Sequence, residues 1–245
     1  MQIRDLGLSI VRRFPKLEML ARQTYALLPS TLHDHPAYHA MRYFGDETFV
    51  TFVYIGAYDG IAGDQIRPLL GMHPTWSGVM LEPQPDAFAR LKSNYASDAS
   101  RLTFVNAAVS NKPGKTSLYH VPRQEIERLE LPDWSRELAS FEREHLLSFF
   151  PEARLAEQPV DVITFADAAA RMPEGRTDLV VMDVEGHESA IIPSIDFDRH
   201  RVRYMIYEHS HLSKSDRQTI TDLLRSYGFK LKKYGRDTVA WRRLA

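Results

Sequence analysis

Residues 49–60 read FVTFVYIGAYDG, and this stretch decides the fold. Its first part, residues 49–55, is a run of apolar, β-branched and aromatic residues, which is typical of a strand buried on both faces. Gly56 and Gly60 follow directly, and glycines here let the chain turn sharply and let a ligand approach the backbone closely. A helix predicted over residues 64–70 points its N-terminus at the same loop. The stretch therefore predicts a buried strand, a ligand-binding loop and a helix in succession.

Strands and helices continue to alternate after this unit. Further strands are predicted at residues 77–82, 102–105, 179–184 and 202–207, with 116–121 pairing beside the third strand. Helices are predicted from residue 85, at 188–192 and at 215–227, followed by a hairpin of residues 229–234 and 238–242. This alternation predicts an α/β fold with a mainly parallel sheet, helices on both faces and an antiparallel C-terminal hairpin. A ligand is then expected beyond the carboxyl ends of the strands.

The composition of the 245 residues excludes several classes of protein. The absence of cysteine removes disulfide frameworks, thiolate metal sites and a cysteine nucleophile. A formal net charge of -1, from 31 basic and 32 acidic residues, argues against a dedicated nucleic-acid binder. No run approaches the roughly 18 apolar residues of a membrane span, and the charges scattered through the first residues do not form a secretory signal. These features predict a cytoplasmic protein.

Two appendages are predicted on one main domain, which spans residues 46–245. Residues 1–45 form a helical extension, in which residues 1–30 carry five basic and two acidic side chains. This basic amphipathic face could contact a membrane surface, or it could pack on its own domain or on the partner of a homodimer. Residues 122–159 interrupt the alternation with dense charge and aromatic residues, and helical spacing covers residues 138–147. This insertion is either a lid over the site or a surface helix without a role in recognition.

Glu82 ends the second predicted strand, 22 residues after Gly60. An acid at this position can accept hydrogen bonds from both hydroxyls of a ribose. Together with the glycine loop it indicates a cofactor that contains a nucleoside, although a surface acid without a ligand remains the alternative. The third glycine of a dinucleotide fingerprint could only be Gly63, and its spacing is wrong. The pattern therefore favours S-adenosylmethionine over a nicotinamide cofactor.

Acidic and imidazole side chains follow the two later core strands. Asp183 and Glu185 lie on the same side of the chain by strand alternation, and Glu208 and His209 end the next strand. Carboxylates this close repel one another unless a cation, a proton or a donor lies between them. The four residues therefore predict either a site for a hard cation such as Mg²⁺ or a general base, although one acid could instead cap the next helix. His187 is a further candidate base.

The order of six segments resembles the FkbM-type S-adenosylmethionine-dependent methyltransferases. The segments are FVYIGAYDG, MLEPQPDAFARLKSNY, FVNAAVSNKPGKTSLY, VDVITFADAA, LVVMDVEGHESAI and YMIYEH, within about residues 48–234. The resemblance implies a Rossmann-like class I methyltransferase fold with a seven-stranded sheet. It also implies O-methylation of a hydroxyl on a sugar, polyketide or related natural product, so the expected partner is a small-molecule or glycan acceptor and not a nucleic acid.

The resemblance further implies roles for individual residues around the cofactor. Gly56, Ala57, Tyr58 and Gly60 would line its methionine and ribose side, Glu82 would hold the ribose hydroxyls, Pro83 and Gln84 would shape the adenine edge, Asn106 and Ala107 would lie near the adenine, and Asp183 would stand near the sulfonium and the acceptor. The expected base is His209 or His187, with a metal on Asp183 and Glu208 as the alternative route.

Two departures from the family pattern bear on activity. Tyr54 stands where the family commonly has an acid, two residues before the first glycine. Val181 and Met182 stand where a lysine commonly precedes the Asp-Val-Glu motif. Because of these departures, a non-catalytic cofactor-binding or assembly protein on the same fold is kept as the alternative function.

Overall fold

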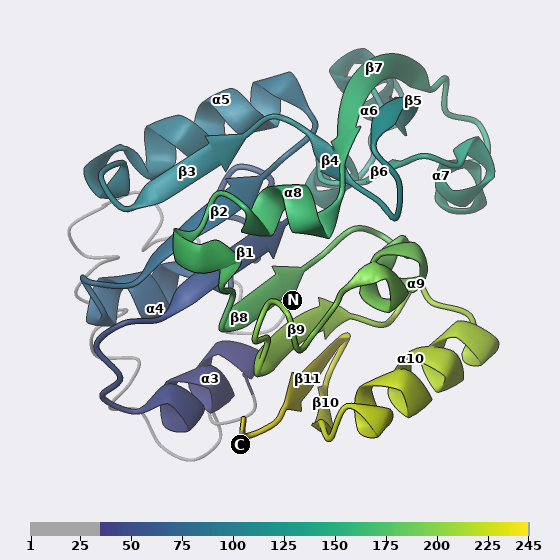
Figure 1. Cartoon of the computed structure of the whole chain (residues 1–245). Helices are drawn as coiled ribbons and strands as arrows, with labels where there is room; N and C mark the ends of the chain where they lie inside the picture. Colours follow the sequence, from purple (N-terminus) through teal and green to yellow (C-terminus); the bar gives the residue numbers. More distant parts are fainter. Residues whose placement is uncertain (1–34, 245) are drawn as a thin grey trace.

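The computed structural model describes residues 35–244, which form one large and one small sheet (Figure 1). Residues 1–34 of the predicted helical extension 1–45 lie outside this range, whereas residues 36–44 do form a helix. The seven strands of the large sheet run in the order β10 (Lys230–Tyr234), β11 (Asp237–Trp241), β9 (Tyr204–Glu208), β8 (Leu179–Met182), β1 (Thr51–Ile55), β2 (Ser77–Leu81) and β3 (Leu102–Val105). Strands β9, β8, β1, β2 and β3 pair in parallel, whereas β11 is antiparallel to both of its neighbours. The predicted parallel sheet with a C-terminal hairpin is confirmed.

The large sheet is covered on both faces, as its strand sequences require. Along β1, Val53 and Ile55 belong to one buried cluster, whereas Phe52 and Tyr54 belong to the other. Helices α8 (Phe165–Ala169), α9 (Glu188–Ile191) and α10 (Lys214–Ser226) cover the first face. Helices α3 (Pro36–Phe44), α4 (Arg67–Met72) and α5 (Pro85–Asn94) cover the second. Strands this apolar are stable only between two such layers.

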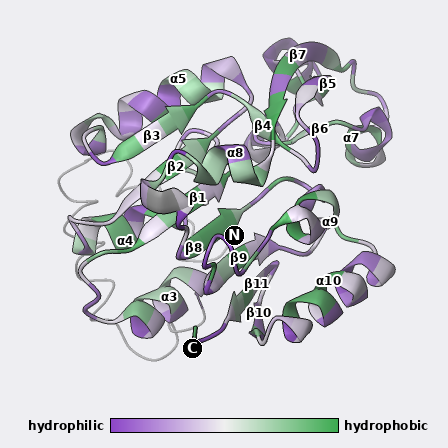
Figure 2. Ribbon diagram, in the orientation of Figure 1, coloured by the Kyte–Doolittle hydropathy of each residue, from purple (hydrophilic) through white to green (hydrophobic). Residues whose placement is uncertain are grey.

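Hydropathy and local signals explain the helices. In Figure 2, β8 is predominantly hydrophobic, whereas α10 carries both hydrophobic and hydrophilic residues along its length. Ser213 caps α10 by accepting a hydrogen bond from the Asp216 amide. Helix α4 begins three residues later than predicted, because the Asp64 carboxylate accepts hydrogen bonds from the amides of Ile66 and Arg67 and holds the preceding turn.

Among residues 35–244, no helix has the length and apolar character needed to cross a bilayer.

The small sheet corrects the prediction for residues 116–121. Strand β5 (Gly114–His120) does not pair beside β3 but runs antiparallel to β7 (Ala156–Ile163), in the order β4 (Ala108–Val109), β7, β5, β6 (Ala139–Ser140). Strand β7 is not predicted from the sequence, because polar residues and a proline interrupt its apolar pattern. In β7 the buried positions are limited to Val160 and Val162. The chain therefore leaves the large sheet after β3 and builds a second layer.

The segment between β5 and β7 contains helices α6 (Arg123–Arg128) and α7 (Arg143–Phe149). Helical structure predicted at residues 138–147 begins only at Arg143, because residues 139–140 form strand β6 against the end of β5. The segment has a core of its own around Ile126, Leu146 and Phe150. Figure 1 places it beyond the carboxyl ends of the central strands, where a ligand is expected.

A test of the packing of the large sheet uses two glycines. A Cβ atom at Gly78 in β2 would lie 2.4 Å from the ring of Phe52 in β1, whereas a Cβ atom at Gly71 in α4 would meet nothing within 4 Å. We expect Gly78→Ala to lower the free energy of unfolding by about 1–3 kcal/mol, because the buried ring has to shift. Gly71→Ala should raise it by about 0.5–1 kcal/mol, since alanine favours a helix over glycine. Urea denaturation measures both, and equal effects would contradict this packing.

Candidate active site

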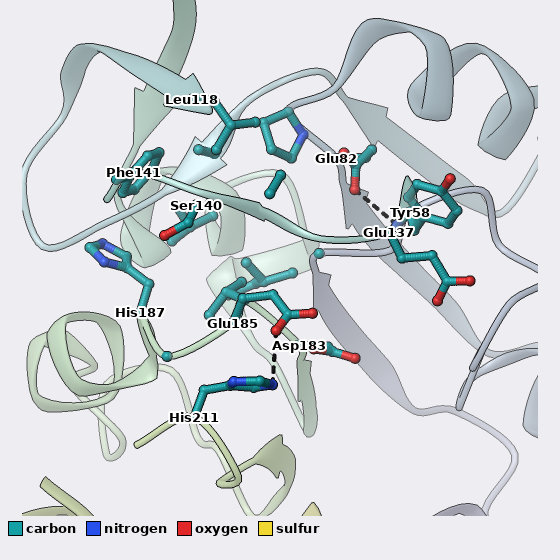
Figure 3. Close-up of a pocket in the computed structure, with 18 of the residues that line it drawn as sticks. Tyr58, Glu82, Leu118, Glu137, Ser140, Phe141, Asp183, Glu185, His187 and His211 are labelled. Carbon is teal, nitrogen blue, oxygen red and sulfur yellow. Dashed lines mark hydrogen bonds and ion pairs between the residues drawn. The ribbon is translucent and has the colours of Figure 1, made fainter. Parts of the chain in front are cut away.

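A cleft of about 370 Å³ opens at the carboxyl ends of β1, β2 and β8 and is closed on one side by the segment between β5 and β7. Of the residues predicted for the site, Gly56, Tyr58, Glu82, Pro83, Gln84, Ala107, Asp183, Glu185 and His187 line it. Ala57, Gly60, Asn106, Glu208 and His209 do not line it. Figure 3 shows Glu82 and Tyr58 at one side of the cavity and Asp183, Glu185 and His211 grouped at another.

The glycine loop after β1 brings two strand ends into direct contact. Gly56 has a φ of 76°, and a Cβ atom there would lie 1.9 Å from the carbonyl oxygen of Asp183. No L side chain fits this approach. The amides of Gly56 and Ala57 both donate to the carbonyl of Leu81, each at 3.0 Å, which fixes the loop to the end of β2. The backbone after β1 therefore forms a rigid floor between Glu82 and Asp183.

Two backbone amides hold the carboxylate of Glu82 at the wall of the cleft. Its Oε2 accepts a hydrogen bond from the Tyr58 amide at 2.9 Å, and its Oε1 accepts one from the Gln84 amide at 2.8 Å. Burial raises the pKa of this carboxyl to about 7. Asn106 lies behind it and donates to the carbonyls of Glu82 and Pro83. Each oxygen of Glu82 retains a lone pair for a ligand hydroxyl.

The predicted group of carboxylates does assemble at the ends of β8 and β9. Asp183, Glu185 and Glu208 each place one oxygen within 4.8 Å of the other two. Burial and the neighbouring Glu208 raise the pKa of Asp183 well above its usual range. Although burial opposes it, hydrogen bonds from Asp183 and Ser210 lower the pKa of Glu208. Asp183 therefore holds a proton that it shares with an ionised Glu208.

Cations already compensate this group. A guanidinium nitrogen of Arg236 lies 2.6 Å from Glu208 Oε1, and His211 Nε2 lies 3.0 Å from Glu185 Oε2. The hydrogen bond with Glu185 raises the pKa of His211. The sequence predicted that Mg²⁺ could offset the repulsion between these carboxylates. A shared proton and two basic side chains offset it instead, so Asp183 and Glu208 can lie together without a divalent ion.

The prediction that His209 is a base or a metal ligand is wrong. Its Nδ1 lies 3.1 Å from the hydroxyl of Thr238 in β11, outside the cleft. The cause is alternation at the end of β9, which points Glu208 toward the carboxylates and the next residue to the other side. His209 therefore neither reaches the carboxylates as a metal ligand nor faces the cleft as a base. His187 does line the cleft, and its Nε2 lies 2.9 Å from the Ser110 hydroxyl.

Glu188 holds the turn that presents these groups. Its two carboxylate oxygens accept hydrogen bonds from the amides of Val184 and Gly186, at 3.0 and 2.9 Å. Glu185, between them, has a φ of 54°, a left-handed conformation that costs energy for a residue with a side chain. The alternative that Asp183 or Glu185 caps the next helix is wrong, because His187 is the N-cap residue of α9 and no side chain makes a capping hydrogen bond there. Glu188, within α9, holds the preceding turn instead.

Several cleft residues were missed by sequence reasoning. Ser140, Phe141, Glu142 and His145 come from the segment between β5 and β7. The aromatic and charged density of the insertion was the available signal, but the sequence does not say which of its side chains turn inward.

The two departures from the family pattern have different surroundings. Tyr54 lines the cleft, and burial together with the nearby Asp64 and Asp183 raises its pKa well above the usual range, so it stays neutral. Val181 and Met182 are buried inside β8, on opposite faces of the sheet. A lysine at either position would therefore have to enter the core.

The strand order, with β11 antiparallel between β9 and β10, and the cleft at the carboxyl ends of β1, β2 and β8 define a Rossmann-like, class I methyltransferase α/β fold. The model of the FkbM methyltransferase domain matches residues 55–231. The chain therefore belongs to the FkbM methyltransferase family, which confirms the resemblance. A comparison with curated proteins gives no match.

Three solved structures are similar to this chain. The methyltransferase FkbM from Methylobacillus flagellatus KT is 17% identical with a TM-score of 0.52, and the match covers 97% of this chain and 61% of that one. The chain thus spans about three-fifths of that protein. Precorrin-6y C5,15-methyltransferase from Geobacter metallireducens GS-15 is 12% identical, with a TM-score of 0.45 and coverage of 84% and 87%. The N-terminal domain of human METTL16 in complex with SAH is 14% identical, with a TM-score of 0.45 and coverage of 89% and 73%.

The buried carboxyls predict how stability depends on pH. Burial raises the pKa of Glu188 to about 7, so between about pH 4.5 and 7 the folded state binds more protons than the unfolded state. The stability that this group contributes is fully present below about pH 4.5 and is lost as the pH rises through 7. We expect Glu188→Gln to flatten this fall by up to about 3 kcal/mol. Urea denaturation from pH 4.5 to 7.5 measures it, with the exposed Glu144→Gln as the control. An unchanged slope would contradict the assignment.

Proposed function

We propose that this chain binds S-adenosylmethionine and transfers its methyl group to a hydroxyl oxygen of a small-molecule or glycan acceptor, such as a sugar or polyketide. The observation that carries the proposal is Glu82, whose carboxylate oxygens are fixed by the amides of Tyr58 and Gln84 at the wall of the cleft. Two oriented acceptors on a buried acid match the two adjacent hydroxyls of a ribose.

The cofactor half of the cleft follows from that anchor. With the ribose on Glu82, the adenine extends toward Pro83, Gln84 and Ala107, and the methionine moiety lies along Gly56 toward Asp183. Ala57, Gly60 and Asn106 support this half from behind. Asn106, for example, fixes the carbonyls of Glu82 and Pro83. Tyr54 takes the place of the expected acid as a neutral hydroxyl beside the methionine end.

The acceptor half is polar and partly aromatic. Ser140, Glu142, Ser189 and Asp216 supply hydroxyl and carboxylate groups, and Phe141 supplies an apolar face. Such a wall suits a ligand with several hydroxyls, because each carboxylate or serine oxygen accepts a hydrogen bond and the ring packs against C–H groups. We propose that residues 122–159 act as a lid over this half and select the acceptor.

The chemistry is an in-line displacement. The bond from the methyl carbon to the sulfonium sulfur breaks as the bond to the acceptor oxygen forms, and the hydroxyl proton passes to a base. Burial lowers the pKa of His187, so its imidazole is neutral and can accept that proton. Asp183, which keeps its own proton, positions the reacting groups instead of serving as the base. Alignment supplies roughly 7–11 kcal/mol of such a barrier, and a placed base about 10²–10⁴-fold in rate.

Cofactor binding is tested with one matched pair of variants. Isothermal titration of S-adenosylmethionine into the full chain should give one site, and Glu82→Gln should weaken it roughly 10- to 100-fold, because the variant replaces one carboxylate oxygen that accepts from the ribose hydroxyls with an amide N–H donor. Glu142→Gln changes a carboxylate in the acceptor half and should leave the affinity unchanged. Absence of binding to the unaltered chain, or equal affinities for both variants, would contradict the assignment.

Methyl transfer is tested with labelled cofactor and a panel of glycans, sugars and hydroxylated metabolites. We expect label in an ether methyl group, and His187→Ala should lower kcat about 10²–10⁴-fold without changing cofactor affinity. Binding of the cofactor without transfer to any hydroxyl of the panel would favour the second candidate, a non-catalytic cofactor-binding or assembly protein. The presence of Tyr54 at the methionine end is the observation that keeps this candidate.

A further inference from the structure

Three potential metal ligands from three separate segments meet at the acceptor side of the cleft. His145 comes from α7, Glu185 from the turn after β8, and His211 from the loop after β9. Each offers one ligand atom, and these atoms all lie within 4.8 Å of one another. The rings of His145 and His211 are 5.2 Å apart and nearly perpendicular. The family resemblance implied no role for His145, which lies in the insertion, and so it did not point to this group.

His145 carries the strongest single indication of a ligand. Its Nε2 is buried, yet it has no hydrogen-bond partner among residues 35–244. A buried polar nitrogen without a partner costs about 1–3 kcal/mol and is uncommon in folded proteins. Because a ligand atom of His145 also lies within 4.8 Å of those of Glu185 and His211, this buried nitrogen without a partner indicates a metal ligand.

The donor set selects the type of ion. Two imidazoles and one carboxylate suit Zn²⁺ and the other first-row divalent transition ions, whereas Mg²⁺ prefers a set of oxygens alone. Three protein ligands leave a coordination position open, as in catalytic metal sites. Glu185 has a left-handed backbone conformation, which costs energy, and such costs concentrate at functional sites.

Arg236 supplies a positive charge next to these three residues. One of its guanidinium nitrogens lies 2.7 Å from His211 Nε2 and 2.6 Å from Glu208 Oε1. The side chain is 66% exposed, so it can swing into solvent without disturbing the core. A cation that enters the site would take over its electrostatic role and would compete with it.

We propose that His145, Glu185 and a neutral His211 bind one divalent transition-metal ion, which displaces Arg236 and the proton of His211 from the metal-free site. The ion would join α7 of the insertion to the loops after β8 and β9, at the wall that faces the acceptor. Binding of the ion does not depend on methyl transfer, so its test can succeed or fail separately from the proposed function.

The test uses Zn²⁺ as the probe on the full chain, treated with EDTA and freed of any affinity tag. Isothermal titration should give one Zn²⁺ per chain. Loss of a direct ligand in His145→Ala or Glu185→Gln should weaken it by more than the 10–100-fold typical of a second-shell change. His187→Ala removes another cleft histidine and should leave the affinity unchanged. Arg236→Ala should strengthen binding, because it removes the competing cation.

Cobalt provides a readout of the ligands themselves. The Co²⁺-loaded chain should show visible absorption bands that change in His145→Ala and stay the same in His187→Ala. Thermal melting identifies any variant that fails to fold, and His145→Gln then replaces His145→Ala. The proposal is overturned if the unaltered chain binds no Zn²⁺, if His145→Ala binds it as tightly, or if Arg236→Ala binds it more weakly.

Discussion

The close approach of Gly56 to the carbonyl of Asp183 is the constraint on which the site depends. Strands β1 and β8 are neighbours in the sheet, and the loop after β1 can cross the end of β8 only where no side chain intervenes. Because of this contact, Glu82 lies on one side of the short loop after β1, and the carboxylates after β8 lie on its other side. The two halves of the cleft that we propose for cofactor and acceptor are adjacent for that reason.

Charge compensation is the second organising feature. Buried carboxyls at Glu82, Asp183 and Glu188 all have raised pKa values, and burial is the main cause in each case. The chain tolerates them because backbone amides, a shared proton, His211 and Arg236 offset the charge. Groups held this way are pre-organised for a ligand, since they need little rearrangement to bind polar atoms.

The sequence predicted the large sheet well and the insertion poorly, for physical reasons. The central strands are buried on both faces, so their composition reveals them directly. Strand β7 is partly exposed and contains Pro159, so its pattern is weak. Glu82 and Asp183 could be found because they end predicted strands. His209 was misplaced because it was grouped with its neighbour Glu208, whereas alternation at the end of β9 points the two side chains to opposite sides. His145 reaches the cleft only through the fold of the insertion, and no local sequence pattern indicates that fold.

The most direct test of the account is a crystal structure of the full chain with S-adenosylhomocysteine. We predict that the two ribose hydroxyls lie within hydrogen-bond distance of the Glu82 carboxylate and that the sulfur lies between Gly56 and Asp183. A nucleoside bound elsewhere, or one whose ribose makes no contact with Glu82, would contradict the central claim.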